Sequence, residues 1–233
     1  MYSIESISDI LGAQALIRQA GAQVAYLQTD SRRIAFPGQS LFFAIKAARD
    51  GHDFIPEAWE KGVRNFVISA ADFQAADFPE GNFLRVEDTL DSLQKLAAAH
   101  RGEFDYPLIG ITGSNGKTVV KEWLFQLLSV DKNIIRSPKS FNSQTGVPLS
   151  LWRMGKEYDL AIVEAGISRP GEMERLERMI RPDIGILTNI GPAHDEGFDS
   201  TEQKISEKLK LFARTFLLIY EKDALRSYSG QVP

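Results

Sequence analysis

The chain contains no cysteine, and other absences narrow what it can be. Without cysteine it has no disulfide framework, no thiolate metal site and no cysteine nucleophile, which fits a reducing compartment. Its N-terminus has neither a basic segment nor an apolar core, so we expect no signal peptide. No apolar run approaches the ~20 residues that span a bilayer, so we expect no membrane insertion.

The chain also lacks a strong excess of positive or of negative charge. The net charge is −4, from 27 basic and 31 acidic residues that are interspersed, which argues against a large nucleic-acid-binding surface. Of the 233 residues, 43% are apolar and 25% are charged, as in soluble globular proteins. A chain of this length can bury a sizeable core in one large or two ordinary domains.

The most informative motif is Gly110-Ile-Thr-Gly-Ser-Asn-Gly-Lys-Thr118, between an apolar run and a helix-like run. A strand, a glycine-rich turn and a helix in this order are typical of a phosphate-binding loop. Its glycines allow a tight turn with inward N–H groups, and the helix N-terminus favours anions. Lys117 would reach the β- and γ-phosphates and the Thr118 hydroxyl would ligate Mg²⁺. The strict pattern G-x-x-x-x-G-K-[ST] is not met, because its first glycine would fall on Ile111.

A chance glycine-rich turn before a lysine is the alternative, and we favour the nucleotide site. The residues predicted to bind ATP are Gly113, Ser114, Asn115, Gly116, Lys117 and Thr118.

We expect two α/β domains, 1–103 and 104–233, joined near 102–107. In the first we expect strands at 23–27, 40–45, 65–69 and 82–86, and helices at 54–62 and 90–100. In the second we expect strands at 108–112, 133–136, 160–164, 184–189 and 216–220, and helices at 117–130, 172–180 and 201–212. This alternation predicts a mostly parallel, doubly wound sheet. Because the chain stops soon after its last strand, we expect the second domain to be incomplete.

Polar residues follow four predicted strands of the second domain, where ligands of parallel sheets bind. Glu164 fits either a magnesium ligand or a paired charge at the sheet edge, and burial of a carboxylate favours the ligand. His194 fits either a functional group or a hydrogen-bonded loop residue. For Asn142 the spacing alone favours a turn cap. For Lys208 the helical geometry alone favours a side chain that extends to water.

Several motifs occur together in one order. They are Thr29-Asp-Ser-Arg-Arg33, Pro37-Gly38, Leu41-Phe-Phe-Ala44, Asp50-Gly-His-Asp-Phe-Ile55, Gly113-Ser-Asn-Gly-Lys-Thr118 and Thr188-Asn-Ile-Gly-Pro-Ala-His194. From about Thr29 to Phe212 the chain thus resembles the Mur ligase family of peptidoglycan synthesis. The last motif is similar to that of members that add D-alanyl-D-alanine to UDP-N-acetylmuramoyl-tripeptide.

The resemblance implies a cytoplasmic, ATP-dependent ligase with a small α/β UDP-binding domain, a P-loop ATP-binding domain and a C-terminal domain that this chain lacks. It implies Lys117, Lys208 and His194 as catalytic residues. It implies Thr118, Glu164, His194 and a carbamylated Lys208 as Mg²⁺ ligands. It implies that Ser31, Arg32, His52 and Asn142 bind the UDP-N-acetylmuramoyl-peptide, with D-alanyl-D-alanine as the second substrate. We expect this chain alone to turn over negligibly.

Some residues depart from the family pattern. They are Ala165 after the glutamate, Ile167-Ser-Arg169 and Val119-Val120, and they resemble the subgroup fused to an alanine racemase domain. Three alternatives stay open: a ligase that adds another amino acid or extends folate with glutamate, an unrelated P-loop kinase or ATPase, and a non-catalytic nucleotide-binding module. The Asp30-Ser-Arg32 and Asp50-Gly-His52 segments argue against a folate ligase.

Overall fold

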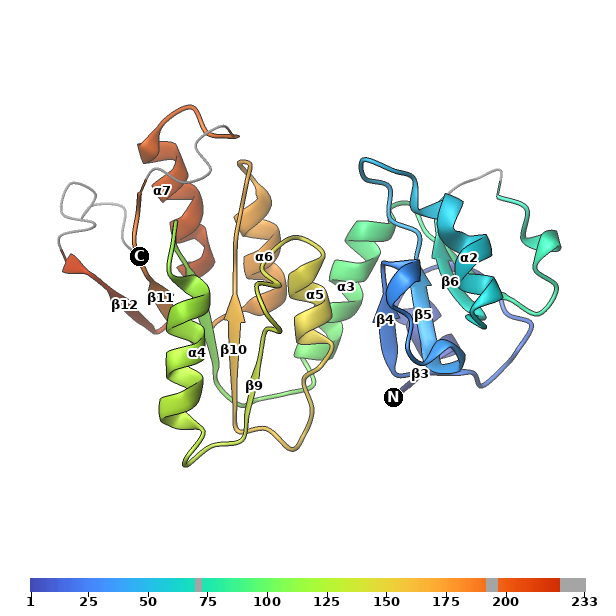
Figure 1. Cartoon of the computed structure of the whole chain (residues 1–233), viewed down its shortest axis with the longest axis horizontal. Coiled ribbons are helices and arrows are strands. Elements are labelled where there is room, and N and C mark those ends of the chain that lie inside the picture. Colours follow the sequence, from blue (N-terminus) through green and yellow to red (C-terminus); the bar gives the residue numbers. More distant parts are fainter. Residues whose placement is uncertain (70–72, 192–196, 223–233) are drawn as a thin grey trace. The chain divides into compact units, whose positions relative to one another are not determined.

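The computed structural model describes residues 1–69, 73–191 and 197–222, and the chain divides into two compact α/β units, Met1–Ala99 and His100–Pro233 (Figure 1). The division falls within helix α3 (Thr89–Arg101), just before the segment 102–107 where the sequence predicts the join. Among the described residues, no helix is both long enough and apolar enough to cross a membrane.

The first unit is built on a five-stranded sheet in which only the outer strand β2 is antiparallel. Its strands, in spatial order, are β2 (Gln14–Leu16), β7 (Asn82–Arg85), β6 (Asn65–Ile68), β5 (Ser40–Phe43) and β4 (Tyr26–Gln28). A separate antiparallel pair joins β1 (Tyr2–Ser3) to β3 (Gln23–Val24), and the helices are α1 (Ile4–Leu11), α2 (Ile55–Glu60) and most of α3.

Aromatic side chains fill the core of the first unit. Every residue of β5 and β6 is buried, as expected for parallel strands that are covered on both faces. The Phe66 ring packs against Phe42 and Phe83, with centroid separations of 6.3 and 5.2 Å, and Trp59 of α2 stacks on it at 6.4 Å. This packed core supports the loops that leave the strands.

Two predictions for the first unit need correction. The run 23–27 is not one strand but two, because β3 pairs with β1 in one sheet and β4 pairs with β5 in another. Helix α1 was not expected, although its sequence carries both end signals: the Ser3 side chain accepts from the Ser6 N–H, and Gly12 ends the helix with φ 66°.

The second unit contains five parallel strands, which confirms the predicted doubly wound sheet. In spatial order the strands are β12 (Leu217–Tyr220), β11 (Ile184–Leu187), β8 (Leu108–Thr112), β10 (Leu160–Glu164) and β9 (Ile134–Arg136). The helices are α4 (Lys117–Leu128), α5 (Gly146–Leu151), α6 (Glu172–Ile180) and α7 (Thr201–Leu209), the last extended by the short turn η6 (Lys210–Phe212).

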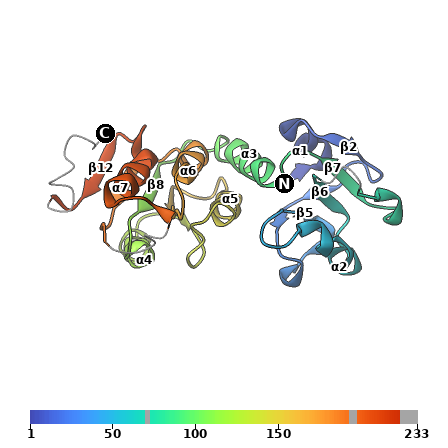
Figure 2. The same cartoon turned by 90° about the horizontal axis from the view of Figure 1, so that it is seen from above.

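Helices cover both faces of this sheet, with α4 on one side and α6 on the other (Figure 2). Under α4, Val120 and Leu124 pack on the buried Ile111 and its neighbours in the sheet. On the opposite face, Gly110 lets the backbone approach closely, because a Cβ there would lie 2.8 Å from Pro182 Cβ. Glycine in β8 is therefore a packing requirement.

The order of the strands indicates where on this sheet a ligand would bind. β8 lies between β10 and β11; α4 carries the chain from β8 to β9, and α6 carries it from β10 to β11. Because these two connections lie on opposite faces, the sheet has a switch point between β8 and β10, where open α/β sheets bind ligands at the carboxyl ends of their strands.

Candidate active site

The loop between β8 and α4 has a conformation that requires glycine at two positions. Gly113 has φ +145°, and a Cβ there would lie 2.0 Å from Thr188 Oγ1. Gly116 has φ +80° and caps the N-terminus of α4. The loop predicted from the motif is therefore a tight turn into a helix N-terminus, whose first N–H groups have no partner within the helix.

The segment after β11 holds this loop in place. Asn189 accepts from the Ser114 N–H through its carbonyl and from the Asn115 N–H through Oδ1, both at 2.8 Å, and Thr188 Oγ1 donates to Asn115 O at 2.6 Å. Two of the N–H groups expected to point inward are thus already bonded. An anion at this loop would meet the N–H groups at the start of α4 instead.

Two lysine ammonium groups meet at the carbonyl of Gly113. Lys117 Nζ donates to Gly113 O at 2.9 Å and to Ser114 O at 3.3 Å, and Lys208 Nζ donates to Gly113 O at 3.2 Å. Burial lowers the pKa of Lys117, and the charge of Glu164 opposes this shift. Burial, together with the charges of Lys117 and Lys204, lowers the pKa of Lys208 to about 8.

Lys208 is only 3% exposed, so its side chain does not extend to water as helical geometry alone favours. Its hydrogen bond to the carbonyl of Gly113, 95 positions away in the chain, fixes its direction, and the helix sequence alone does not contain this information. The side chain therefore lies on the loop side of α7, next to Lys117.

The Glu164 carboxylate, at the end of β10, is completely buried and lies against α4. Its Oε2 accepts from Thr118 Oγ1 at 3.0 Å. Its Oε1 lies 2.8 Å from Lys121 Nζ in an ion pair, but no donor is aligned to make a hydrogen bond to it. Lys121 was not predicted; its position one turn after Lys117, on the same side of α4, is the signal that could have found it.

These oxygens suit Mg²⁺. The Thr118 hydroxyl oxygen and the Glu164 carboxylate beside it are hard ligands, and Mg²⁺ commonly uses one or two carboxylates plus phosphates and waters. Within the described part of the chain, no three His, Cys, Asp or Glu side chains form a metal cluster by themselves. His194 lies outside the described residues, so its roles stay predictions.

A crevice of about 320 Å³ adjoins the two lysines. It is lined by Lys117, Asn142, Ser143, Gln144, Thr145, Gly166, Ile167, Ser168, Glu172 and Lys208. Asn142 is held against the segment after β10, because its carbonyl accepts from the Gly166 N–H at 2.8 Å and a Cβ at Gly166 would lie 3.0 Å from its side chain. Asn142 therefore faces the same space as Lys117 and Lys208.

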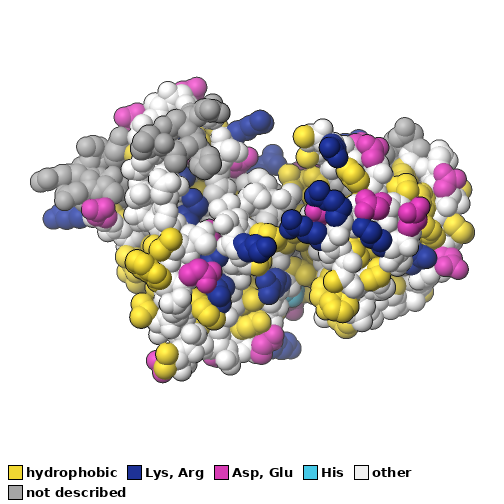
Figure 3. Space-filling view, in the orientation of Figure 1, with side chains coloured by type: hydrophobic (Ala, Val, Ile, Leu, Met, Phe, Trp, Pro, Cys, Tyr) yellow, Lys and Arg dark blue, Asp and Glu magenta, His cyan; other side chains and the backbone are white. Residues whose placement is uncertain are grey.

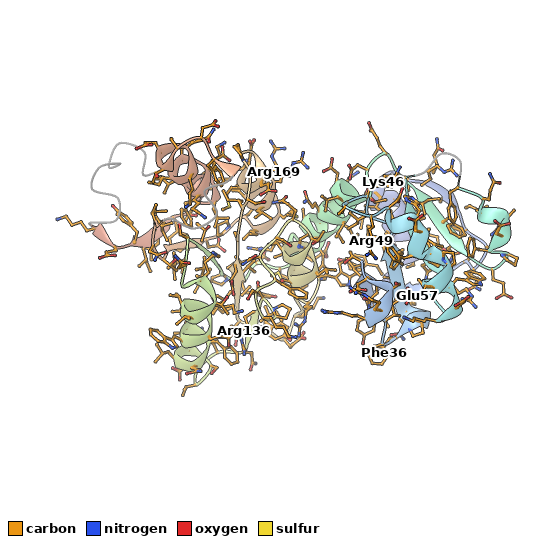
Figure 4. All side chains as sticks on the ribbon, turned by 45° about the horizontal axis from the view of Figure 1, so that its top comes forward. Phe36, Lys46, Arg49, Glu57, Arg136 and Arg169 are labelled. Carbon is orange, nitrogen blue, oxygen red and sulfur yellow. The ribbon has the colours of Figure 1, made fainter. Side chains whose placement is uncertain are left out.

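The first unit has its own cavity of about 470 Å³, lined by Thr29, Asp30, Ser31, Arg32, Ala48, Arg49 and Phe54. Arg32 forms a paired hydrogen bond with the Asp30 carboxylate at 2.8 and 2.9 Å, which lowers the pKa of Asp30 to about 2. The buried Ser31 donates from Oγ to Glu57 Oε2 at 2.6 Å. Arg49 extends from the segment after β5 (Figure 4), and basic side chains gather on the face of this unit shown in Figure 3.

His52 is not among the residues that line this cavity. Its Nδ1 lies 2.5 Å from Asp50 Oδ1, and its Nε2 accepts from the Ser69 N–H at 3.0 Å. This pattern is that of the neutral tautomer with the proton on Nδ1. His52 therefore joins the loop after β5 to the end of β6, and its contact with substrate stays a prediction.

The model of the Mur ligase middle domain matches residues 111–225 of this chain. The UDP-N-acetylmuramoyl-tripeptide--D-alanyl-D-alanine ligase of Bacillus subtilis (strain 168) is 35% identical over 88% of this chain and 43% of its own length. That of Escherichia coli (strain K12) is 32% identical over 91% of this chain and 45% of its own length. The chain thus spans about half the length of the curated relatives it matches.

Solved structures agree with this similarity. MurF from Acinetobacter baumannii covers 97% of this chain with a TM-score of 0.83 and 23% identity, and this chain spans 52% of it, which shows the shared fold. MurF from Thermotoga maritima in complex with ADP covers 90% of this chain with a TM-score of 0.74 and 28% identity, and this chain spans 48% of it. The chain therefore belongs to the Mur ligase family, and it corresponds to the N-terminal and central regions of the D-alanyl-D-alanine ligases.

Proposed function

We propose that this chain supplies the substrate-binding and ATP-binding domains of a ligase that adds D-alanyl-D-alanine to UDP-N-acetylmuramoyl-tripeptide. The observation that carries the proposal is the Thr118–Glu164 contact beside Lys117, at the switch point of the sheet. Relatives named for this activity match most of the chain. Under this proposal, residues 1–103 hold the UDP-linked substrate and residues 104–233 hold ATP.

The nucleotide phosphates would bind at residues 113–118. The N-terminus of α4 offers N–H groups to an anion, and Lys117 would move from the carbonyls of Gly113 and Ser114 to a phosphate oxygen. Thr118 and Glu164 would hold Mg²⁺, with His194 as a further expected ligand. The metal ion would offset the charge that develops on the phosphates.

Lys208 would act beside Lys117. Its amine lies within hydrogen-bonding distance of the loop, and a pKa of about 8 leaves a larger uncharged fraction near neutral pH than an ordinary lysine has. An uncharged amine is the form that adds CO₂, so this environment supports the expected carbamylation.

Two sets of residues are proposed to bind the UDP-linked substrate, and each set lies within one unit. The cavity that Ser31 and Arg32 line would take the uridine diphosphate end, since an exposed guanidinium suits phosphate oxygens. Asn142, in the crevice next to Lys117, would face the peptide end.

The reaction would proceed in two steps. A carboxylate oxygen of the tripeptide attacks the γ-phosphorus of ATP, the bond to the ADP oxygen breaks, and an acyl phosphate forms. The D-alanyl-D-alanine amine then attacks the acyl carbon, loses a proton, and phosphate leaves. Residues of this chain would mainly bind and orient the reactants and offset charge.

A calorimetric titration of the 233-residue chain with UDP-N-acetylmuramoyl-tripeptide and with the corresponding dipeptide tests the assignment. We expect tighter binding of the tripeptide. Preference for the dipeptide would exclude the D-alanyl-D-alanine step, and binding of neither ligand would exclude the substrate class. Free UDP serves as the control that separates recognition of the nucleotide from recognition of the peptide.

A further inference from the structure

Lys121 is a completely buried lysine in the middle of α4, and the proposed reaction gives it no task. Removing an ammonium group from water costs several kcal/mol unless charges and hydrogen bonds compensate for the lost hydration. The partners of this side chain therefore indicate why it is there.

One partner is the neighbouring Glu122 of α4, whose Oε1 lies 3.2 Å from Lys121 Nζ, and the others come from the ends of two neighbouring strands. Lys121 Nζ donates to Ser137 O at 2.8 Å and to Lys139 O, both in the segment after β9. It also lies 2.8 Å from Glu164 Oε1 at the end of β10. One ammonium group thus connects the helix after the phosphate loop to both strand ends.

The two oxygens of the Glu164 carboxylate have different neighbours. Oε1 lies beside the Lys121 ammonium and Oε2 accepts from Thr118 Oγ1. Both Lys121 and Glu164 have fully buried side chains, so water contributes little to orienting or neutralising the carboxylate. The Lys121 ammonium is in direct contact with this carboxylate and can supply both the orientation and the opposite charge.

The second set of contacts reaches the crevice. Lys139 has φ +50°, which is uncommon for a residue other than glycine, and its carbonyl accepts from Lys121. Three residues later the same segment presents Asn142 to the crevice. Lys121 therefore holds the start of the segment that carries Asn142.

We propose that Lys121 is a positioning residue for the magnesium–nucleotide site, where its ammonium compensates the Glu164 charge and aims the carboxylate at Thr118. The inference rests on the proposed function, because it assigns Lys121 a task in binding Mg²⁺ with a nucleotide. The competing explanation is that the lysine only stabilises the fold.

The test measures ADP binding by the 233-residue chain, with Mg²⁺ and in EDTA, for wild type and Lys121→Met. We expect the variant to weaken Mg²⁺-dependent binding on the order of tenfold or more, as loss of a residue that orients a metal ligand does. Binding of ADP in EDTA, which depends on the loop, should change little. Equal losses in both conditions, or an unchanged Mg²⁺ dependence in a folded variant, would overturn the proposal.

The double variant Lys121→Met/Glu164→Gln keeps the test decisive if the single variant does not fold, because it removes both buried charges together. If Lys121 acts through Glu164, the double variant binds Mg²⁺–ADP no more weakly than Glu164→Gln alone. Additive losses contradict the proposal. Glu122→Gln is the matched control: it removes the charge of a partly buried carboxylate 3.2 Å from the Lys121 ammonium, one that makes no contact with Thr118, and it should leave Mg²⁺ dependence unchanged.

A wild-type chain that does not bind ADP in any condition would instead count against the proposed function. In that case Lys121→Met should still release the segment after β9, which shows as faster hydrogen exchange at residues 137–142. Unchanged exchange there in a folded variant would remove the structural basis of the inference.

Discussion

Thr118 and Glu164 are separated by 46 positions in the chain, yet Thr118 Oγ1 donates to Glu164 Oε2 across 3.0 Å. Thr118 lies in the first turn of α4 and Glu164 ends β10, and parallel pairing of β8 with β10 brings the two together. This contact joins the phosphate loop to the carboxylate that suits a metal ion.

Replacing Thr118 with valine should therefore remove the proposed magnesium ligand while preserving the shape of the side chain. We expect Mg²⁺-dependent binding of ADP to weaken about tenfold or more, because hard oxygen ligands cannot be replaced by a methyl group. Calorimetry with and without Mg²⁺ measures the effect. Val119→Ala, at a half-exposed neighbouring position, is the control, and equal behaviour of the two variants would contradict a metal-binding role for Thr118.

Gly113→Ala should disrupt the loop itself. Its φ of +145° disfavours any side chain, and the new Cβ would lie 2.0 Å from Thr188 Oγ1. We expect a loss of stability of about 1–3 kcal/mol and a loss of ADP binding, measured by chemical denaturation and calorimetry. Gly171→Ala is the matched control, because Gly171 has φ +82° but nothing within 4 Å of a Cβ. It should be destabilised by backbone strain while still binding ADP.

Arg32→Ala should raise the pKa of Asp30 from about 2 toward its ordinary value of 3.8, because the hydrogen bonds and charge of Arg32 hold it low. A group with a depressed folded-state pKa stabilises the fold above its unfolded pKa, and this contribution is lost as pH falls. The stability difference between wild type and variant should therefore shrink between pH 5 and about 2.

NMR titration of the Asp30 carboxyl carbon measures the shift directly. Arg33→Ala should have a smaller effect, because Arg33 is 3.6 Å from Asp30 and is the weakest of the causes. A larger shift in Arg33→Ala would reverse the assignment.

His52→Ala should reduce stability more than it reduces affinity for a UDP-linked ligand. Its ring bonds the Asp50 carboxylate and the Ser69 N–H, and leaving such partners unsatisfied costs about 1–3 kcal/mol. Denaturation and a titration with UDP compare the two effects. A large loss of affinity in a variant with wild-type stability would instead place His52 on the substrate, as the family resemblance predicts.

The sequence located the long elements well where the local signals are strong. The apolar runs of β8 and β10 and the periodicity of α6 appear in the structure with the expected bounds. The short α5 (Gly146–Leu151) and the exposed β2 (Gln14–Leu16) were missed, since six and three residues are too few to establish a period. Residues 23–27 were predicted as one strand, but the two halves pair with different partner strands. The local sequence does not reveal those partners.

The sequence by itself determined a glycine-rich loop between a buried strand and a helix, with Lys117 and Thr118 at its end, because glycine content and apolar patterning are local properties. Only the tertiary structure decided that Lys208 points inward, that Asn189 accepts from two loop amides, and that Lys121 forms an ion pair with Glu164. Each of these depends on contacts between strand ends that are distant in the chain. Burial and charge compensation arise from packing, and no single segment specifies them.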